Sequence, residues 1–351
     1  MPIPQVPLRW FASDNAAGAH PQVLDALVAA NAGHALAYGQ DDWTRRATSA
    51  FCELFDRDVE VLFTFGGTGA NVVALSCILP PAHAIACSRW AHIAVDEAGA
   101  PERFLGTKLI LLDSIDGTVH PADVAGLKPL LGSQHHAPPG VLSLTQTTEM
   151  GAVWSVDALR DACAAARDLG LRVHLDGARI ANASAALGGR TALREMVADV
   201  DVLSFGGTKA GAVYGEAVIF FDPSLARHAM NLRKQATQLP SKMRFVAAQY
   251  EALLADDLFI ELGRRSNTAA RRLHERLCDL VDLDLGNPPQ ANSLFPRLEP
   301  GAKSILQDWS FFWDWDLSDR RVRWMTAWDT SDDDVERFAD GIRWVLQHGD
   351  N

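Results

Sequence analysis

The sequence lacks the features that mark several broad classes of protein. Its five cysteines are odd in number, scattered, and without any CxxC spacing, which argues against a disulfide framework and against a zinc site. No run of about 18 uninterrupted apolar residues occurs, and the N-terminal segment holds no long apolar region. We therefore expect a cytoplasmic protein with neither a metal site nor a membrane partner.

Basic residues are fewer than acidic residues in this sequence. The chain carries 44 acidic and 32 basic residues, and its net charge of −12 is spread along the sequence rather than gathered in one tail. A protein that binds the phosphate backbone of a nucleic acid normally presents a basic face. The composition therefore predicts no nucleic acid partner, although isolated Arg and Lys residues can still hold one anionic ligand.

The composition otherwise describes an ordinary globular protein. The chain has 351 residues, of which 48% are apolar and 22% charged, enough for one large domain and a smaller one. Short apolar runs alternate with helical patterns through the first two thirds of the chain, which predicts an α/β domain with a mainly parallel, seven-stranded sheet. The expected strands are residues 59–65, 84–87, 108–112, 141–145, 171–175, 201–205 and 217–221.

The pattern changes in the last third of the chain. A long helical stretch over residues 242–278 is followed by a Pro-rich break at 287–290. Strands are expected at 293–297 and 321–325, and a last helix at 333–346. The sequence thus predicts a large domain over residues 1–240 and a smaller α+β domain over residues 241–351.

Two of the expected strands end in residues that suit one chemistry. Asp176 follows the strand at 171–175, and Lys209 follows the strand at 201–205 after two glycines. An enzyme that uses pyridoxal phosphate (PLP) needs a lysine to bind the cofactor aldehyde and a carboxylate to keep its pyridine nitrogen protonated. Taken singly, Asp176 could cap a helix and Lys209 could be a solvated loop residue. We expect Gly206 and Gly207 to let the backbone pass close to a flat ring.

A glycine-rich turn follows the first expected strand. Residues Gly66–Asn71, with the sequence GGTGAN, lead directly into an apolar helical stretch. Free N–H groups and the positive end of a helix dipole make such a turn a seat for phosphate. The turn matches neither GxGxxG nor GxxxxGK[ST], which counts against a dinucleotide-binding or non-catalytic α/β protein.

With these elements in order, the chain resembles the threonine aldolase and β-eliminating lyase family, whose members are PLP enzymes of fold type I, the aspartate aminotransferase-like fold. The resemblance covers nearly the whole chain and is strongest to the low-specificity L-threonine and phenylserine aldolases. Its most specific motifs are LDGAR and SFGGTK. The others are FASDN, AYGQDDW, FGGTGAN, SRWAHIAVDEAGAPE, SKMRF and RWMTAWDTS.

The resemblance assigns roles to matching residues around the cofactor ring. It implies that Lys209 is the cofactor-binding lysine and that Asp176 is the partner of the pyridine nitrogen. Arg179 matches the arginine near the cofactor oxygen and the substrate carboxylate, and His92 matches the histidine that stacks on the ring.

The resemblance also implies residues for the phosphate. Gly67, Thr68 and Gly69 match the phosphate-binding turn, in agreement with the argument from the helix terminus. Arg244, in SKMRF, matches a phosphate-contacting arginine, and one option is that it reaches the site of a neighbouring subunit.

Three further residues match positions that bind substrate. Ser13 and Arg323 resemble the pair that holds the amino acid carboxylate, a task that suits a fork-shaped guanidinium. Tyr38 is a candidate contributed by a second subunit. The resemblance therefore implies a homodimer or homotetramer with sites at the subunit interface.

The chain departs from the family pattern in one catalytic feature. A second histidine is expected in the loop before the strand at 141–145, where ungapped spacing favours His135 and a one-residue deletion favours His136. The catalytic base could be His92, the loop histidine or a bound water. Ala210 and Tyr214 also differ from common family residues and could reshape the pocket.

The predicted function is cleavage of L-threonine, L-allo-threonine or related β-hydroxy-α-amino acids, phenylserine among them, to glycine and an aldehyde. The predicted catalytic residues are Lys209, His92, His135 and Asp176, and the predicted cofactor is pyridoxal 5'-phosphate. The alternative is a PLP-dependent β-eliminating lyase that acts on another amino acid.

Overall fold

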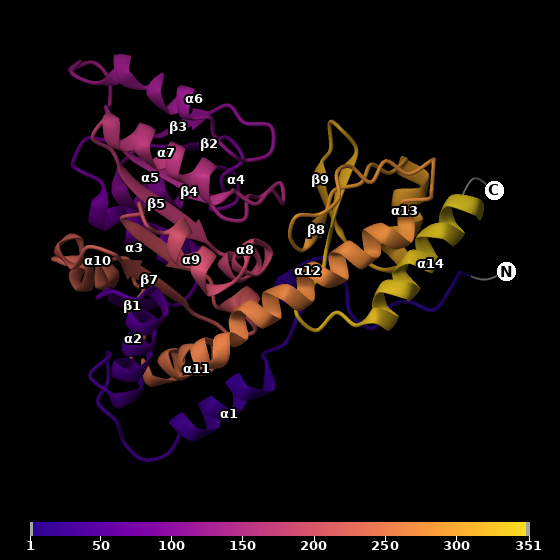
Figure 1. Ribbon diagram of the computed structural model, residues 1–351, viewed down its shortest axis with the longest axis horizontal. Helices are drawn as coiled ribbons and strands as arrows, with labels where there is room; N and C mark the ends of the chain where they lie inside the picture. The colour runs from indigo at the N-terminus through magenta and orange to yellow at the C-terminus, as the bar shows by residue number, and fades with distance from the viewer. Residues whose placement is uncertain (1–2, 349–351) are drawn as a thin grey trace.

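The computed structural model describes residues 3–348 and shows a large and a small lobe joined by one long helix (Figure 1). No helix within the described residues combines the length and the apolar character needed to cross a bilayer. The predicted α/β class is confirmed.

A seven-stranded sheet forms the centre of the large lobe, with the strand order β1-β7-β6-β5-β4-β2-β3. All neighbouring strands are parallel except β7, which is antiparallel to both β1 and β6. Every predicted strand of this domain is present, within two residues at each end. The strands are β1 (Glu60–Thr64), β2 (Ala84–Ser88), β3 (Leu109–Leu112), β4 (Pro139–Thr145), β5 (Arg172–Gly177), β6 (Val202–Phe205) and β7 (Glu216–Phe220).

Helices cover both faces of this sheet, because the strands are apolar on both sides. On β6, Leu203 and Phe205 belong to one hydrophobic core cluster, whereas Val202 belongs to another. This separation follows from the two-residue period of a strand. The helices of the large lobe are α1 (Pro21–Ala30), α2 (Asp42–Phe55), α3 (Gly67–Ile78), α4 (His92–Val95), α5 (Ala100–Leu105), α6 (Pro121–Ala125), α7 (Val156–Asp168), α8 (Ile180–Leu187), α9 (Arg190–Met196), α10 (Ala229–Gln235) and α11 (Arg244–Leu254).

Strand register brings the predicted site residues to one edge of the sheet. Thr145 of β4 lies opposite Asp176 of β5, and Gly177 lies opposite Phe205 of β6. The carboxyl ends of these three parallel strands therefore meet, which is where ligands bind in sheets of this kind.

The long helix α12 (Leu258–Leu277) connects the two lobes (Figure 1). The single predicted helix at 242–278 is wrong, because Asp256 and Asp257 adopt left-handed backbone angles and separate α11 from α12. Apolar residues from Met243 to Leu262 belong to the core of the large lobe. The domain boundary predicted at residue 241 therefore lies too early in the chain.

The small lobe packs a three-stranded antiparallel sheet, ordered β8-β10-β9, against two helices and the end of α12. The sequence prediction missed β9 and α13, and it placed the end of β8 three residues too late. The elements are β8 (Ser293–Leu294), α13 (Pro300–Trp309), β9 (Trp313–Asp316), β10 (Arg321–Met325) and α14 (Asp332–His348).

The described residues that precede Ser13 belong to the small lobe rather than to the large one. Phe11 is buried and stacks on Phe338 of α14 with ring centroids 4.1 Å apart, and Trp324 packs edge-on against the same ring at 5.3 Å. This aromatic cluster anchors the residues that immediately precede Ser13 and Asp14.

Replacing Phe338 with alanine should lower the free energy of unfolding by about 3–5 kcal/mol, the usual cost of removing a buried aromatic ring. A denaturant titration followed by tryptophan fluorescence measures this change. Phe311→Ala is a matched control, because that ring is 40% exposed. Equal destabilisation by both variants would contradict the role of Phe338 as the centre of this core.

Candidate active site

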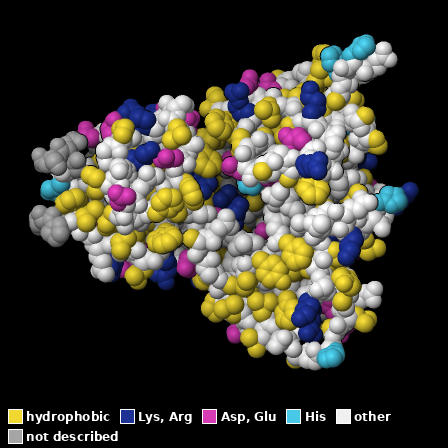
Figure 2. All heavy atoms as spheres, turned by 180° about the vertical axis from the view of Figure 1, so that it is seen from behind, with side chains coloured by type: hydrophobic (Ala, Val, Ile, Leu, Met, Phe, Trp, Pro, Cys, Tyr) yellow, Lys and Arg dark blue, Asp and Glu magenta, His cyan; other side chains and the backbone are white. Residues whose placement is uncertain are grey.

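A cavity of about 290 Å³ lies at the carboxyl edge of the large sheet. Its walls come from the turn after β1, the start of α4 and the ends of β5 and β6. Figure 2 shows the molecule hollowed between its two lobes, with Lys or Arg and histidine side chains in the hollow. Six predicted residues line the cavity: Gly67, Thr68, His92, Asp176, Lys209 and the variant position Tyr214.

Asp176 and Lys209 come together in this cavity, as predicted. Asp176 ends β5, where its carboxylate accepts hydrogen bonds from the Ala178 N–H (2.9 Å) and from Asn71 Nδ2 (2.8 Å). Lys209 lies in the 3₁₀ turn Thr208–Ala210 that follows β6. Burial and the nearby charge of Arg179 lower the pKa of the Lys209 amine, which favours the neutral, nucleophilic form.

The glycine-rich turn after β1 is the start of α3 itself. The helix begins at Gly67, and its N-cap residue Gly66 supplies no side-chain hydrogen bond. The first N–H groups of α3 are therefore free to bind an anion. Space next to the Cα atoms of Gly66 and Gly67 is open, whereas a Cβ at Gly69 would overlap the carboxamide of Gln238.

The glycines before Lys209 are also required by close contacts within the protein. A Cβ on Gly206 would lie 2.7 Å from the backbone carbon of Ala178, and one on Gly207 would lie 2.6 Å from Tyr250 Oη. Both positions exclude a Cβ because the protein itself is too close. These contacts are with the turn after β5 and with α11. Gly206 also lines the cavity, so the role of these glycines beside a flat ring stays a prediction.

His92 begins α4 and is held at two points. Its backbone N–H donates to Glu149 Oε1 (2.7 Å), and its ring Nδ1 lies 2.8 Å from Glu97 Oε1. Asn71 Nδ2 also donates to Glu97 Oε1 at 2.8 Å. Sequence reasoning did not single out Glu97, Glu149 or Asn71, although all three lie in or beside the segments that carry the family motifs.

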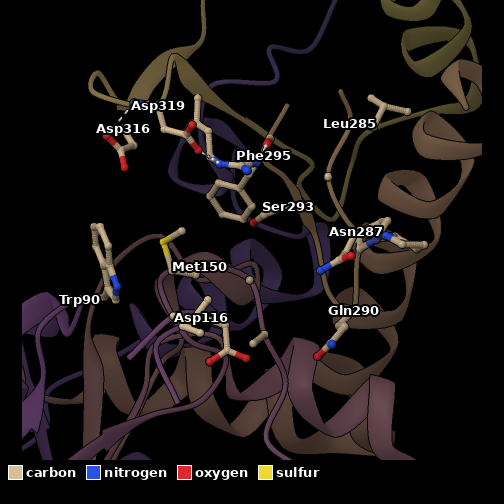
Figure 3. A pocket seen from close by; sticks show the side chains of 17 residues that line it. Trp90, Asp116, Met150, Leu285, Asn287, Gln290, Ser293, Phe295, Asp316 and Asp319 are labelled. Carbon is tan, nitrogen blue, oxygen red and sulfur yellow. Dashed lines mark hydrogen bonds and ion pairs between the residues drawn. The ribbon is translucent and has the colours of Figure 1, made fainter. Parts of the chain in front are cut away.

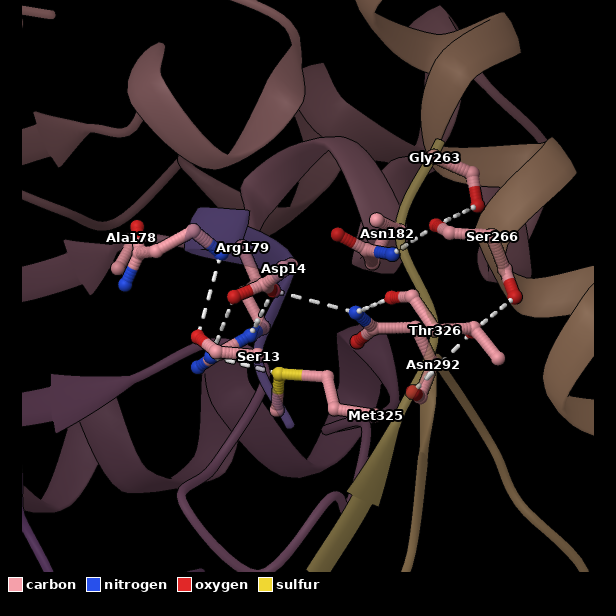
Figure 4. Close-up of polar contacts among 12 residues, drawn as sticks. Ser13, Asp14, Ala178, Arg179, Asn182, Gly263, Ser266, Asn292, Met325 and Thr326 are labelled. Carbon is pink, nitrogen blue, oxygen red and sulfur yellow. Dashed lines mark hydrogen bonds and ion pairs between the residues drawn. The ribbon is translucent and has the colours of Figure 1, made fainter. Parts of the chain in front are cut away.

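Arg179 is paired with an aspartate that sequence reasoning missed. Arg179 Nε and Nη2 donate to the two carboxylate oxygens of Asp14 at 2.6 and 3.0 Å, and Asn292 Nδ2 donates to Asp14 at 3.1 Å (Figure 4). Burial alone would raise the pKa of Asp14, but the charges of Arg179 and Lys209 hold it below its usual value. Arg179 Nη1 is the guanidinium nitrogen outside this pair.

Arg323 reaches the same region from β10 in the small lobe. Its Nη2 donates to the carbonyl of Ala12 at 3.5 Å, beside Ser13, and its guanidinium stacks on Trp315 at 4.6 Å. Arg323 Nε is buried and has no hydrogen-bond partner among the described residues. Burial and the charge of Arg179 lower the pKa of Arg323 to about 10. A buried cation of this kind calls for an anionic partner.

Two buried carboxyl groups near the cavity, neither of them predicted, have raised pKa values. Glu216 of β7 accepts a hydrogen bond from the Gly207 N–H at 2.6 Å, and burial raises its pKa to about 7. Burial and the neighbouring charge of Asp176 raise the pKa of Glu149 to about 7 as well. Burial thus favours the neutral form of both carboxyl groups.

Tyr38 and Arg244 do not line the cavity of their own chain. They belong to one surface region, where the Tyr38 N–H donates to the Ser241 carbonyl and Arg244 Nη1 donates to the Gly33 carbonyl. Tyr38 is exposed. Their predicted action on the site of a second subunit stays a prediction.

The structure does not bring His135 or His136 to the cavity. Both are exposed in the loop before β4. Because β4 is parallel to β5, this loop lies at the amino edge of the sheet, near Arg172, whereas Asp176 lies at the carboxyl edge. Neither histidine therefore lines the cavity of its own chain, and the role of His135 or His136 as the base stays a prediction.

A second cavity of about 470 Å³ lies between the lobes. Trp90, Asp116 and Met150 of the large lobe face Phe295 and Asp319 of the small lobe across it (Figure 3). Arg321, on the same strand as Arg323, donates to Asp319 and to the carbonyl of Phe295. None of the predicted site residues lines this cavity.

Comparison with known proteins gives consistent matches. The sequence profile of the β-eliminating lyases matches residues 11–299. A low specificity L-threonine aldolase of Pseudomonas aeruginosa is 41% identical over 96% of this chain and 97% of its own length. The solved structure of a Leishmania major threonine aldolase superimposes with a TM-score of 0.89 at 32% identity, over 96% of this chain and 99% of that one.

A more distant match shows the fold alone. A serine palmitoyltransferase of Sphingomonas wittichii superimposes with a TM-score of 0.74 at 14% identity, over 97% of this chain and 87% of its own. The predicted fold type I architecture is confirmed by these two structures together.

Proposed function

The chain belongs to the threonine aldolase and β-eliminating lyase family, and we propose that it cleaves L-threonine, L-allo-threonine or related β-hydroxy-α-amino acids, phenylserine among them, to glycine and an aldehyde. It is a carbon–carbon lyase. The observation that carries this proposal is the meeting of Lys209 and Asp176 in one cavity, on a chain 41% identical to a relative named for this activity.

The residues of the cavity fit PLP as the cofactor. The lone lysine of the cavity has its amine pKa lowered by burial, and the Asp176 carboxylate is held by two donated hydrogen bonds. The uncapped start of α3 at Gly67, Thr68 and Gly69 suits a phosphate. We propose that Lys209 Nζ holds the cofactor aldehyde and that Asp176 pairs with its pyridine nitrogen, with His92 over the ring. When bound, PLP accepts the electron pair released from the Cα–Cβ bond.

The chain's own residues would bind and orient the amino acid. Arg323, whose Nε has no partner among residues 3–348, is the proposed partner of the substrate carboxylate, assisted by Ser13 and by Arg179 Nη1. His92 is the proposed base that takes the proton of the β-hydroxyl group, since a histidine ring titrates near neutral pH. His92 is supported over His135 because only His92 lines the cavity.

We propose that a second copy of the chain completes the phosphate site, in a homodimer or a homotetramer. Arg244 and Tyr38 do not line the cavity of their own chain, and the same chain exposes Val28 and Leu36. Figure 2 shows apolar side chains gathered below the hollow between the lobes. An apolar surface beside a basic residue suits contact with a second subunit.

Product identification tests the proposed reaction. The PLP-loaded protein is incubated separately with L-threonine, L-allo-threonine and L-phenylserine, and glycine, aldehyde, ammonia and 2-oxo acid are measured. Glycine and aldehyde in equal amounts support aldol cleavage. A 2-oxo acid with ammonia would instead show β-elimination, the alternative within the same family.

A further inference from the structure

Four side chains form a continuous hydrogen-bonded chain from the floor of the cavity to its histidine. Asn71 Nδ2 lies 2.8 Å from Asp176 Oδ2 and 2.8 Å from Glu97 Oε1. The same Glu97 oxygen lies 2.8 Å from His92 Nδ1. Two carboxylates at opposite ends of one amide nitrogen fix the orientation of the Asn71 carboxamide, because only its NH₂ group can donate to both.

This arrangement also fixes the proton on the histidine ring. An ionised carboxylate only accepts hydrogen bonds, so the hydrogen between a Glu97 carboxylate and His92 Nδ1 belongs to the ring. The Glu97 side chain is 0% exposed, whereas that of His92 is 39% exposed. The other ring nitrogen, Nε2, is left without the proton, on a side chain that lines the cavity.

This row of hydrogen-bonded side chains destabilises the fold, which argues against a purely structural role. Asn71 Oδ1 and Glu97 Oε2 are both buried and have no hydrogen-bond partner within residues 3–348. Each buried polar atom without a partner destabilises the folded state. An arrangement kept for stability alone would be expected to satisfy these atoms.

We propose that Glu97 is a positioning residue that holds His92 in the Nδ1-protonated tautomer, and that Asn71 ties this pair to Asp176. The proposal rests on the function proposed above, where His92 takes the proton of the substrate hydroxyl group. The lone pair of Nε2 is then the proton acceptor. Asn71 donates hydrogen bonds to both Asp176 and Glu97. The bond to Asp176 fixes Asn71, and Asn71 in turn keeps the Glu97 carboxylate beside His92.

The two carboxylates in this hydrogen-bonded row both favour the protonated form of His92. The hydrogen bond from Glu97 raises the pKa of His92, and the charge of Asp176 adds to it, while burial and the charge of Lys209 oppose them. Glu149 contacts His92 only through the backbone N–H of that residue. Loss of the Glu97 charge should therefore lower the pKa of His92, and the acid limb of the kcat/KM profile should move to lower pH, because His92 must be neutral to accept a proton.

The direct test is nitrogen NMR of the PLP-loaded protein labelled with ¹⁵N-histidine, with the His92 signals assigned through His92→Asn. We expect the native protein to show Nδ1 protonated and Nε2 as the lone-pair nitrogen above the pKa of the ring. In Glu97→Gln we expect a mixture of tautomers, a lower His92 pKa, and a fall in plateau kcat of about 10²-fold, within the range that a positioned base contributes.

Glu149→Gln is the matched control, because it removes a carboxylate that touches His92 only through the backbone. It should leave the tautomer of His92 unchanged. The native protein alone can overturn the proposal, if its His92 carries the proton on Nε2, so the test survives poor folding of a variant. The proposal would also be overturned if Glu97→Gln kept both the native tautomer of His92 and the native acid limb of the kcat/KM profile. The NMR result does not depend on which products form, so failure of the aldolase proposal would be seen separately.

Discussion

Replacing Lys209 with alanine should lower kcat by at least about 10⁴-fold, because the variant lacks the amine proposed to hold the cofactor aldehyde. The fold should be retained, since Lys209 lies in a short turn and makes no hydrogen bond or ion pair with another described side chain. Circular dichroism checks the fold. The visible absorption of the lysine-bound cofactor should disappear.

A second lysine provides the control for this variant. Lys108 is exposed at the amino end of β3, on the edge of the sheet away from the cavity. Lys108→Ala removes the same charge and should leave absorption and turnover unchanged. Borohydride reduction of the native protein followed by peptide mass spectrometry should find the cofactor on Lys209. Retained turnover in Lys209→Ala, or an adduct on another lysine, would refute the assignment.

Replacing Arg323 with alanine should lower kcat/KM by about 10²–10³-fold, mainly through KM. Loss of one partner from a desolvated charge pair costs about 3–4 kcal/mol, and each 1.4 kcal/mol corresponds to tenfold. The guanidinium lies beside Ser13 and has a buried Nε without a partner among the described residues. Initial rates over a range of L-threonine concentrations separate KM from kcat.

Arg321→Ala is a close control, because it removes an arginine two residues away on the same strand. Its guanidinium is already engaged by Asp319 and the Phe295 carbonyl. We expect its KM to stay near that of the native protein. An unchanged KM in Arg323→Ala, or an equal rise in both variants, would show that the substrate carboxylate is held elsewhere.

The sheet could be predicted from the sequence because its strands are short apolar runs whose polar successors mark their ends. Asp176 and Lys209 follow two such runs directly, so parallel pairing brings them to one edge. The family motifs then gave roles to His92, Arg179 and Arg323. Such local signals need no knowledge of which strands are neighbours.

The partners of these residues could not be predicted in the same way. Asp14 meets Arg179 across 165 positions of sequence, and Asn71 meets Asp176 across 105. No local period encodes such contacts. The position of His135 before β4 matches the family pattern, but within one chain the direction of β4 places this loop at the edge of the sheet away from Asp176.

The domain boundary predicted at residue 241 differs from the structure for a related physical reason. Helical periodicity continues from α11 into α12, and the two left-handed aspartates that separate them carry no strong turn signal. Burial decides the boundary, and it assigns Phe11 to the small lobe although Phe11 begins the chain's first motif. Ser13 therefore follows directly on a segment anchored in the small lobe, the lobe that also carries Arg323.

The measurement that tests the central claim most directly is the product balance from L-threonine with the PLP-loaded native protein. We expect one glycine and one acetaldehyde for each threonine consumed, and neither product with Lys209→Ala. Formation of ammonia and a 2-oxo acid in place of glycine would contradict it.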